Sequence, residues 1–176
     1  MKLDLSAFLA NDEKVLDFKG ELESNESKYD IDNLNLIFPI QYQGSIYDLE
    51  SELLLELKLD YKYETNCDRC LKPITQKTNT QLEARHYRTE DKPEDQAMVE
   101  NFELKDKKLS LDDLIISQII TSRPLKDLCD LDCKGLCPYC GKNLNNDNCD
   151  CKEKYEEQNT DPRFEKLMDL FNDEEV

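Results

Sequence analysis

Residues 47–64 read YDLESELLLELKLDYKYE. From residue 53 to residue 64, apolar or aromatic side chains occupy the odd positions and charged side chains the even ones, with Leu54 as the single exception. A period of two places alternate side chains on opposite faces of a strand. The stretch therefore predicts a long strand in an antiparallel sheet, with one face against a core and the other in water.

Shorter strand patterns lie on both sides of this stretch, at residues 15–22, 34–43 and 74–87. We expect them to be its neighbours in a meander, with Pro39 at an edge or a bulge because proline cannot donate to a strand ladder. Residues 89–100 are polar and contain a proline, which predicts a loop. Residues 101–109 predict one more strand.

Two segments have the pattern of helices. In the first, near residues 111–122, Ser110 and Asp113 resemble a capping box, and Pro124 ends the helix. Its apolar stripe predicts packing against the sheet and consists of Leu111, Leu114, Ile115 and Ile119, with Gln118 on the same face. The second helix, near residues 162–171, begins with an Asp-Pro pair, and its stripe of Phe164, Leu167, Met168 and Phe171 suits either core packing or docking elsewhere.

The formal net charge is −17 and is unevenly distributed. Residues 1–122 carry 15 basic and 26 acidic side chains, residues 123–154 carry six of each, and residues 155–176 carry two and eight. Such a surface repels phosphate at long range, so we expect a basic protein partner rather than naked nucleic acid. The sequence starts without a signal-peptide pattern and contains no run of eighteen apolar residues, which predicts a cytoplasmic protein without a membrane span.

Six of the eight cysteines fall within residues 129–151. In a reducing compartment such clusters are more often metal ligands or redox thiols than disulfides. In a C-x-x-C turn both thiolates reach one zinc ion at about 2.3 Å, and two pairs complete a tetrahedron. We therefore predict a structural zinc site of Cys137, Cys140, Cys149 and Cys151. The remaining cysteines, Cys67, Cys70, Cys129 and Cys133, predict a second site, although six neighbouring thiols allow other partitions.

Other chemistry can use the same residue types. An iron–sulfur cluster accepts the same ligand sets, whereas a redox pair needs its first cysteine at a helix N-terminus, and the residues after Cys70 have the pattern of a strand. A catalytic zinc site keeps one position open and usually includes histidine or carboxylate ligands. The single histidine, His86, lies in a predicted strand far from the cysteine cluster in sequence. With neither a nucleophile elbow nor a phosphate-binding glycine loop in the sequence, we predict a protein that is not an enzyme.

One segment is locally basic. Between residues 69 and 88, five cationic side chains are opposed only by Glu83. They can contact phosphate or a stacked base, or they can neutralise neighbouring acidic strands, which we favour. The candidate nucleic-acid-binding residues are Arg69, Lys72, Lys77, Arg85 and Arg88.

The string LCDLDCKGLCPYCGKNLN at residues 128–145, with CDRCL at 67–71, CDC at 149–151 and DPR at 161–163, resembles the YceD family. The opening MKLDLS and the SLDDLI segment are also similar to that family. The resemblance implies a non-enzymatic bacterial and plastid factor needed for accumulation of large-subunit ribosomal RNA, and hence a role in ribosome biogenesis. Its partner would be a large-subunit precursor or a basic ribosomal or assembly protein. One or two structural zinc ions would fix a segment whose apolar content is too small to fold it.

These patterns predict an α+β protein in three parts. A mainly antiparallel β-sheet body with one packed helix occupies residues 1–122. A cysteine-rich zinc module occupies residues 123–154, and an acidic tail with a short terminal helix occupies residues 155–176.

Overall fold

The computed structural model describes residues 1–11, 13–88 and 100–151. The chain divides into two compact units. The first combines Met1–Thr65 with Pro73–Asp127, and the second combines Asn66–Lys72 with the described residues 128–151. The predicted helix near 162–171 and nearly all of the predicted loop at 89–100 lie outside the described residues.

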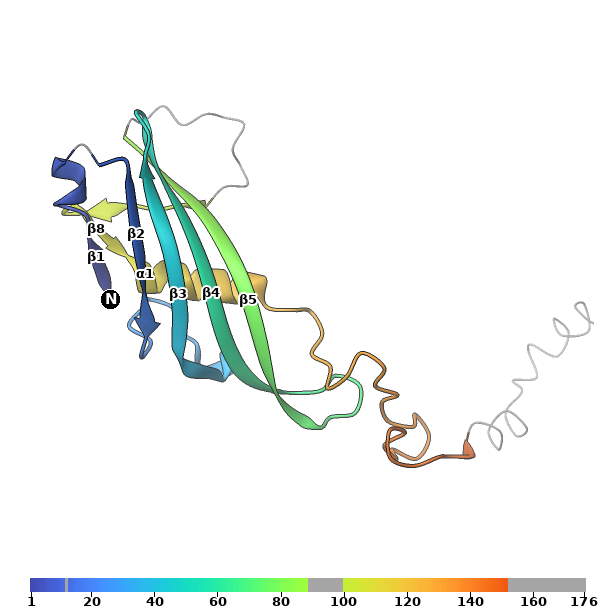
Figure 1. The fold of residues 1–176 in the computed structure, drawn as a ribbon. Coiled ribbons are helices and arrows are strands. Elements are labelled where there is room, and N and C mark those ends of the chain that lie inside the picture. The colour runs from blue at the N-terminus through green and yellow to red at the C-terminus, as the bar shows by residue number, and fades with distance from the viewer. Residues whose placement is uncertain (12, 89–99, 152–176) are drawn as a thin grey trace, which may run out of the picture. The chain divides into compact units, whose positions relative to one another are not determined.

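Two sheets and one helix dominate the first unit (Figure 1). One sheet has the strand order β2-β3-β4-β5-β6 and the other β1-β8-β7. The paired strands β2–β3, β3–β4, β1–β8 and β7–β8 are antiparallel, and β6 is parallel to β5, which confirms the α+β class. The elements are β1 (Lys2–Asp4), η1 (Phe8–Ala10), β2 (Val15–Leu22), η2 (Asp32–Leu34), β3 (Leu36–Asp48), β4 (Glu52–Asn66), β5 (Pro73–Tyr87), β6 (Glu100–Asn101), β7 (Leu104–Lys105), β8 (Lys108–Ser110) and α1 (Leu111–Ser122).

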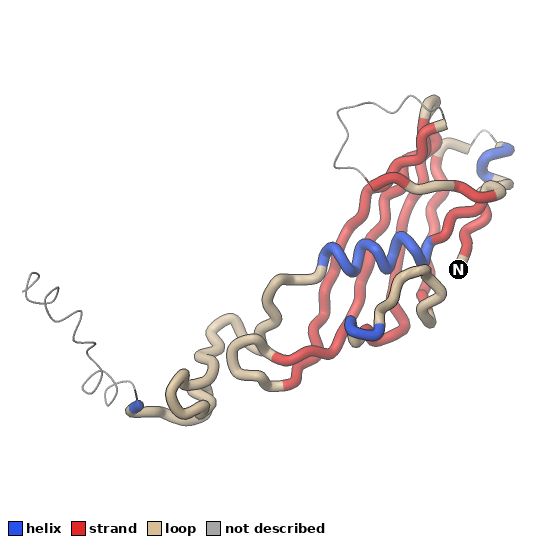
Figure 2. The backbone as a smooth tube through the Cα atoms, turned by 180° about the vertical axis from the view of Figure 1, so that it is seen from behind, coloured by secondary structure: helices blue, strands red, loops and turns tan. Residues whose placement is uncertain are grey.

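The core of this unit lies between one face of the larger sheet and α1, which lies across it (Figure 2). In β4 the odd-numbered residues from Leu53 to Tyr63 are at most 2% exposed, which confirms the period-two prediction. Gln118 of α1 donates hydrogen bonds to the Thr80 hydroxyl at 2.8 Å and to the Gln81 carbonyl at 2.9 Å. Each fully buried aliphatic side chain contributes about 1.5–3 kcal/mol. The buried apolar side chains of α1 are Leu111, Leu114, Ile115, Ile116 and Ile119.

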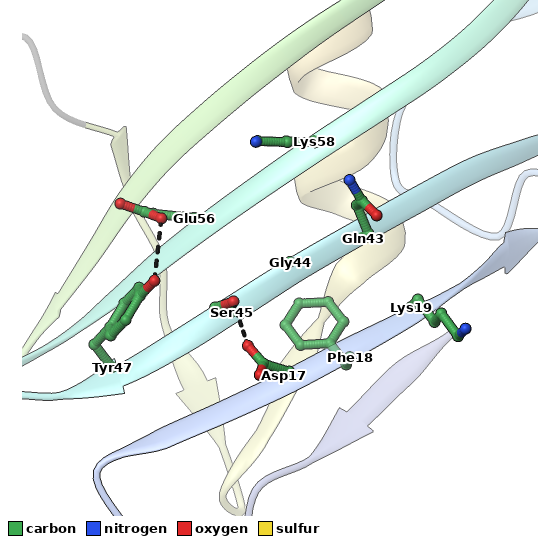
Figure 3. A pocket seen from close by; sticks show the side chains of 9 residues that line it. All are labelled: Asp17, Phe18, Lys19, Gln43, Gly44, Ser45, Tyr47, Glu56 and Lys58. Atoms are coloured by element: carbon green, nitrogen blue, oxygen red, sulfur yellow. Dashed lines mark hydrogen bonds between the residues drawn. The ribbon is translucent and has the colours of Figure 1, made fainter.

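The opposite face of strands β2 to β4 is solvent-exposed and carries polar and charged side chains, some of which Figure 3 shows. Cross-strand pairing aligns Asp17 with Ser45 and Ser45 with Glu56, and the Ser45 hydroxyl donates to the Asp17 carboxylate. The next row contains Lys19 and Lys58. Acidic and basic rows therefore alternate, so this face has no single sign of charge.

Two turns divide segments that the sequence predicted as single strands. The quoted stretch 47–64 contains the end of β3 and a tight turn before β4, in which Leu49 and Glu52 exchange backbone hydrogen bonds of 3.0 and 3.2 Å. Residues 101–109 form parts of three short strands, because Asp106 and Lys107 adopt φ values of 52° and 59° and turn the chain back. Positive φ at both central residues matches the right-handed twist of a two-residue hairpin.

Proline has the effect that the sequence predicts. The β3–β4 register shifts between Ile37 and Gln41, on either side of Pro39, so the ladder is interrupted where the sequence predicts an edge or a bulge. Among the described residues, helices with the length and apolar character needed to cross a membrane are absent.

Candidate metal centres

The first cysteine turn links β4 to β5. The Cys67 amide donates to the Lys72 carbonyl at 2.8 Å, and the Leu71 amide donates to the Cys67 carbonyl at 2.8 Å. Leu71 closes the turn with φ at 58°, in the left-handed region that favours glycine. The turn thus brings the Cys67 and Cys70 sulfurs together and leaves Leu71 exposed.

The second turn, around Cys137 and Cys140, repeats the same hydrogen bonds. The Cys137 amide donates to the Lys142 carbonyl at 2.8 Å, and the Gly141 amide donates to the Cys137 carbonyl at 2.9 Å. Gly141, with φ at 73°, occupies the position that Leu71 occupies in the first turn. Two segments far apart in the sequence therefore form the same kind of thiolate-presenting turn.

Four sulfurs, from Cys67, Cys70, Cys129 and Cys133, form one cluster, hereafter the Cys67 site. All four lie within 4.8 Å of one another. The Cys67 and Cys133 sulfurs are 3.8 Å apart, and those of Cys70 and Cys129 are 3.6 Å apart. A tetrahedral zinc ion with Zn–S bonds of about 2.3 Å separates its sulfurs by about 3.8 Å, whereas a disulfide requires about 2.05 Å. The spacing suits a single ion, and none of these sulfurs is bonded to another.

The second cluster, hereafter the Cys137 site, contains Cys137, Cys140, Cys149 and Cys151, again within 4.8 Å. The Cys149 sulfur lies 3.4 Å from that of Cys140 and 3.5 Å from that of Cys137. The amide of Cys151 also points at the Cys149 sulfur, at 3.4 Å. Only Cys137 is buried here, whereas three cysteines of the Cys67 site are buried, so solvent reaches the Cys137 site more easily. None of the eight cysteines is in a disulfide.

Thiols of the Cys67 site differ in acidity. Burial opposes ionisation of Cys67, but backbone amide hydrogen bonds outweigh it and lower the pKa of Cys67 to about 6. Hydrogen bonds to the neighbouring thiols, that of Cys133 first, raise the pKa of Cys129 to about 12. Burial also opposes ionisation of Cys133, yet the Asn145 side chain helps to lower its pKa.

The Cys137 site has the same division. Backbone amides of Cys140 and Tyr139 lower the pKa of Cys137 to about 7. A hydrogen bond with the Cys151 thiol is the main cause of the raised pKa of Cys149, which lies at about 12. Four neighbouring thiolates repel one another, so they share protons until a cation compensates their charge. The donor set therefore fits a divalent metal ion.

Gly135 and Asn145 also belong to this region, although the cysteine spacing does not predict them. Gly135 has φ at 77°, and a Cβ atom added there would lie 3.0 Å from the Arg69 carbonyl oxygen. The Asn145 amide group lies 3.3 Å from the Cys133 sulfur. A glycine two residues after a ligand cysteine is the sequence signal for the first, and an asparagine between two cysteine pairs is the signal for the second.

Three of the candidate nucleic-acid-binding residues lie on or near the first turn. The Arg69 guanidinium donates through Nη1 to the backbone carbonyls of Leu131 at 3.3 Å and Cys133 at 2.8 Å. This side chain therefore fastens the turn to the segment that carries Cys133. Lys72 and Lys77 are exposed.

The other two candidates, Arg85 and Arg88, lie in carboxylate surroundings. Arg85 forms ion pairs with Glu52 at 3.0 Å and Glu83 at 3.1 Å. Arg88 forms an ion pair with Asp48 at 2.6 Å. Their charges are therefore largely compensated within the first unit.

Comparison with known proteins gives one result. A family model described as large ribosomal RNA subunit accumulation protein YceD matches residues 55–171, more than half of the chain. The matched range includes all eight cysteines and α1. Neither a curated protein nor a solved structure matches the chain significantly.

Proposed function

Because the chain belongs to the YceD family of large ribosomal RNA subunit accumulation proteins, we propose that it is a non-enzymatic cytoplasmic factor for ribosome biogenesis whose cysteine-rich unit is held by two structural zinc ions. Membership of the family implies a role in the accumulation of large-subunit ribosomal RNA. The observation that supports the structural role is that each site offers four sulfur ligands. A tetrahedral ion with four protein ligands keeps no position open for water or substrate.

The alternative is an iron–sulfur or redox protein. In a four-iron cluster each cysteine binds a different iron atom, which spreads the sulfurs further apart than around one ion. The sulfurs of each site instead lie within 4.8 Å of one another, with two pairs in each site at 3.4–3.8 Å, which supports a mononuclear ion in each site. Zinc fits because four thiolates in tetrahedral arrangement are its usual structural ligands. When bound, the ion cross-links segments that have little apolar core of their own.

The partner that we propose is a basic ribosomal or assembly protein, or a large-subunit precursor that presents one. The net charge of −17 disfavours naked RNA. Two arginines of the locally basic segment, Arg85 and Arg88, are already paired with carboxylates. A thiolate site with one divalent ion also carries a net charge of −2, so metal-loaded sites remain attractive to cations.

A direct RNA-binding module is a second candidate because Lys72 and Lys77 are exposed. Reversing both charges in Lys72→Glu/Lys77→Glu leaves the Arg69, Arg85 and Arg88 contacts intact. Loss of ribosomal RNA binding in a protein-free assay would favour this candidate. Unchanged association with precursors in cells would favour the basic protein partner.

The experiment that tests the proposed function is affinity capture of the full chain from cells, with and without ribonuclease treatment. We expect large-subunit precursors to copurify, and a basic protein to remain bound after the RNA is digested. Depletion of the protein should reduce large-subunit ribosomal RNA and spare the small-subunit RNA. Capture without large-subunit material, or depletion that leaves both RNAs unchanged, contradicts the proposal.

A further inference from the structure

We propose that Asn145 couples the two metal sites, so that an ion in the Cys137 site strengthens metal binding at the Cys67 site. This inference rests on the proposed metal sites. It adds a residue that is itself not a ligand, and it predicts that the sites fill cooperatively rather than independently.

Asn145 belongs to the Cys137 site by sequence but contacts the Cys67 site. It lies in the loop between Cys140 and Cys149, and its side-chain amide donates toward the Cys133 sulfur over 3.3 Å. Its side-chain oxygen accepts the Lys134 amide at 2.8 Å. One side chain thus orients both a ligand sulfur and the backbone next to it, which is the usual way in which outer residues tune metal affinity.

The rest of the loop keeps Asn145 in that position. The Leu144 amide donates to the Gly135 carbonyl at 2.9 Å, and Leu136 forms an isolated antiparallel bridge with Asn143. The backbone amide of Asn145 also donates to the Asn143 side-chain oxygen at 3.0 Å, within the loop. The contacts with Gly135 and Leu136 join the loop to the segment that follows Cys133, within the second unit.

Metal in the Cys137 site closes this loop. The ion joins Cys140 to Cys149, whose sulfurs lie 3.4 Å apart at the two ends of the loop. Without it, ordering the loop costs conformational entropy that the Asn145 contacts must then offset. With it, Asn145 is already placed when the Cys67 site binds its ion. The coupling is reciprocal for binding free energies, so each ion strengthens the other.

Two features make Asn145 a clean probe of this coupling. The residue is exposed, so Asn145→Ala removes hydrogen bonds without opening a cavity in a core. Its neighbour Asn146 is also exposed, and Asn146 donates to the Asn143 carbonyl through its backbone amide, which an alanine retains. Asn146→Ala is therefore a matched control.

The test is a titration of the metal-free, reduced full chain with Co²⁺ in competition with a chelator, followed by thiolate-to-cobalt absorption. The wild-type chain should bind two ions. Asn145→Ala should weaken the Cys67 site about 10- to 100-fold, the usual range for an outer-shell partner, and Asn146→Ala should not. Asn145→Asp retains the acceptor for Lys134 but places a negative charge beside the Cys133 thiolate, so it should weaken this site more than alanine does.

Removal of the Cys137 site, alone and together with Asn145→Ala, completes a double-mutant cycle. Cys140→Ser/Cys149→Ser should weaken the Cys67 site in the wild-type background and have little further effect in Asn145→Ala. Equal affinities for Asn145→Ala and Asn146→Ala, or an undiminished effect of site removal in Asn145→Ala, overturn the coupling while the metal sites stand. Failure of the wild-type chain to bind two ions instead overturns the proposed metal sites.

Discussion

Substitution of Gly135 by alanine tests how tightly the two segments of the Cys67 site must approach. At φ of 77° a residue with a Cβ atom is disfavoured by about 1–2 kcal/mol. The added Cβ would also lie 3.0 Å from the Arg69 carbonyl oxygen, which accepts the Leu136 amide at 3.0 Å. Loss of that hydrogen bond costs about 1 kcal/mol more. We therefore expect Gly135→Ala to destabilise the site by about 2–3 kcal/mol.

Because metal binding and folding of such a unit are linked, this destabilisation should appear as roughly 30- to 150-fold weaker zinc binding at the Cys67 site. Gly141→Ala is the matched control. Its φ is 73°, but nothing lies within 4 Å of the added Cβ, so only the backbone cost of about 1–2 kcal/mol applies. Competition between the full chain and a chromophoric zinc chelator measures both variants.

The relative loss of zinc affinity in the two variants tests the close approach of Gly135 to Arg69. Gly135→Ala should act mainly on the Cys67 site and Gly141→Ala mainly on the Cys137 site, with the larger loss at the former. Equal losses of affinity in Gly135→Ala and Gly141→Ala would refute the close approach of Gly135 to Arg69, and wild-type affinity in Gly135→Ala would refute the whole estimate.

Three further predictions concern the sheet body and the metal. Tyr63→Phe removes a 2.6 Å hydrogen bond to the buried Asp127 carboxylate. In chemical denaturation this variant should lower the free energy of unfolding by about 1–3 kcal/mol. Tyr61→Phe loses a 3.3 Å contact with the Ser122 hydroxyl and should lower it less. Burial, followed by the Asp127 hydrogen bond, raises the pKa of Tyr63 from 10.0 to about 12, so the stabilisation by Tyr63 is complete below pH 10 and is lost as pH rises toward 12. The difference in free energy of unfolding between wild type and Tyr63→Phe should therefore shrink over that interval. A constant difference would contradict this prediction. In a hydrogen-exchange experiment, a strong chelator should abolish amide protection in residues 128–151 while β4 remains protected. The more exposed Cys137 site should lose its ion first. Equal loss of protection in β4 would contradict separate cores for the two units.

The sequence predicts the larger sheet well because β4 obeys one strong rule. Its side chains alternate with Leu54 as the one exception, so burial of one face determines the register. The turn before β4 is less visible, since Leu49 continues the apolar pattern and the turn contains no glycine. The β7–β8 hairpin is hard to predict for the same reason, because its turn residues Asp106 and Lys107 have positive φ values but neither is a glycine.

The cysteine clusters are predictable to a different degree. Paired spacing indicates which thiols can share an ion, and the structure brings the same two sets of four together. Spacing carries no information about Arg69, whose positive charge suggests a phosphate ligand but whose guanidinium binds two backbone carbonyls. The partners of a long polar side chain depend on which distant segment lies beside it. The same reason hides the contact between Asn145 and Cys133.

X-ray absorption at the zinc edge, combined with metal analysis of anaerobically purified full chain, is the measurement that bears most directly on the central proposal. We predict two zinc ions per chain, each with four sulfur neighbours at about 2.3 Å, and a colourless protein. Iron with visible absorption, nitrogen or oxygen neighbours in place of sulfur, or metal-free protein whose cysteines are joined as disulfides would contradict the proposed zinc sites.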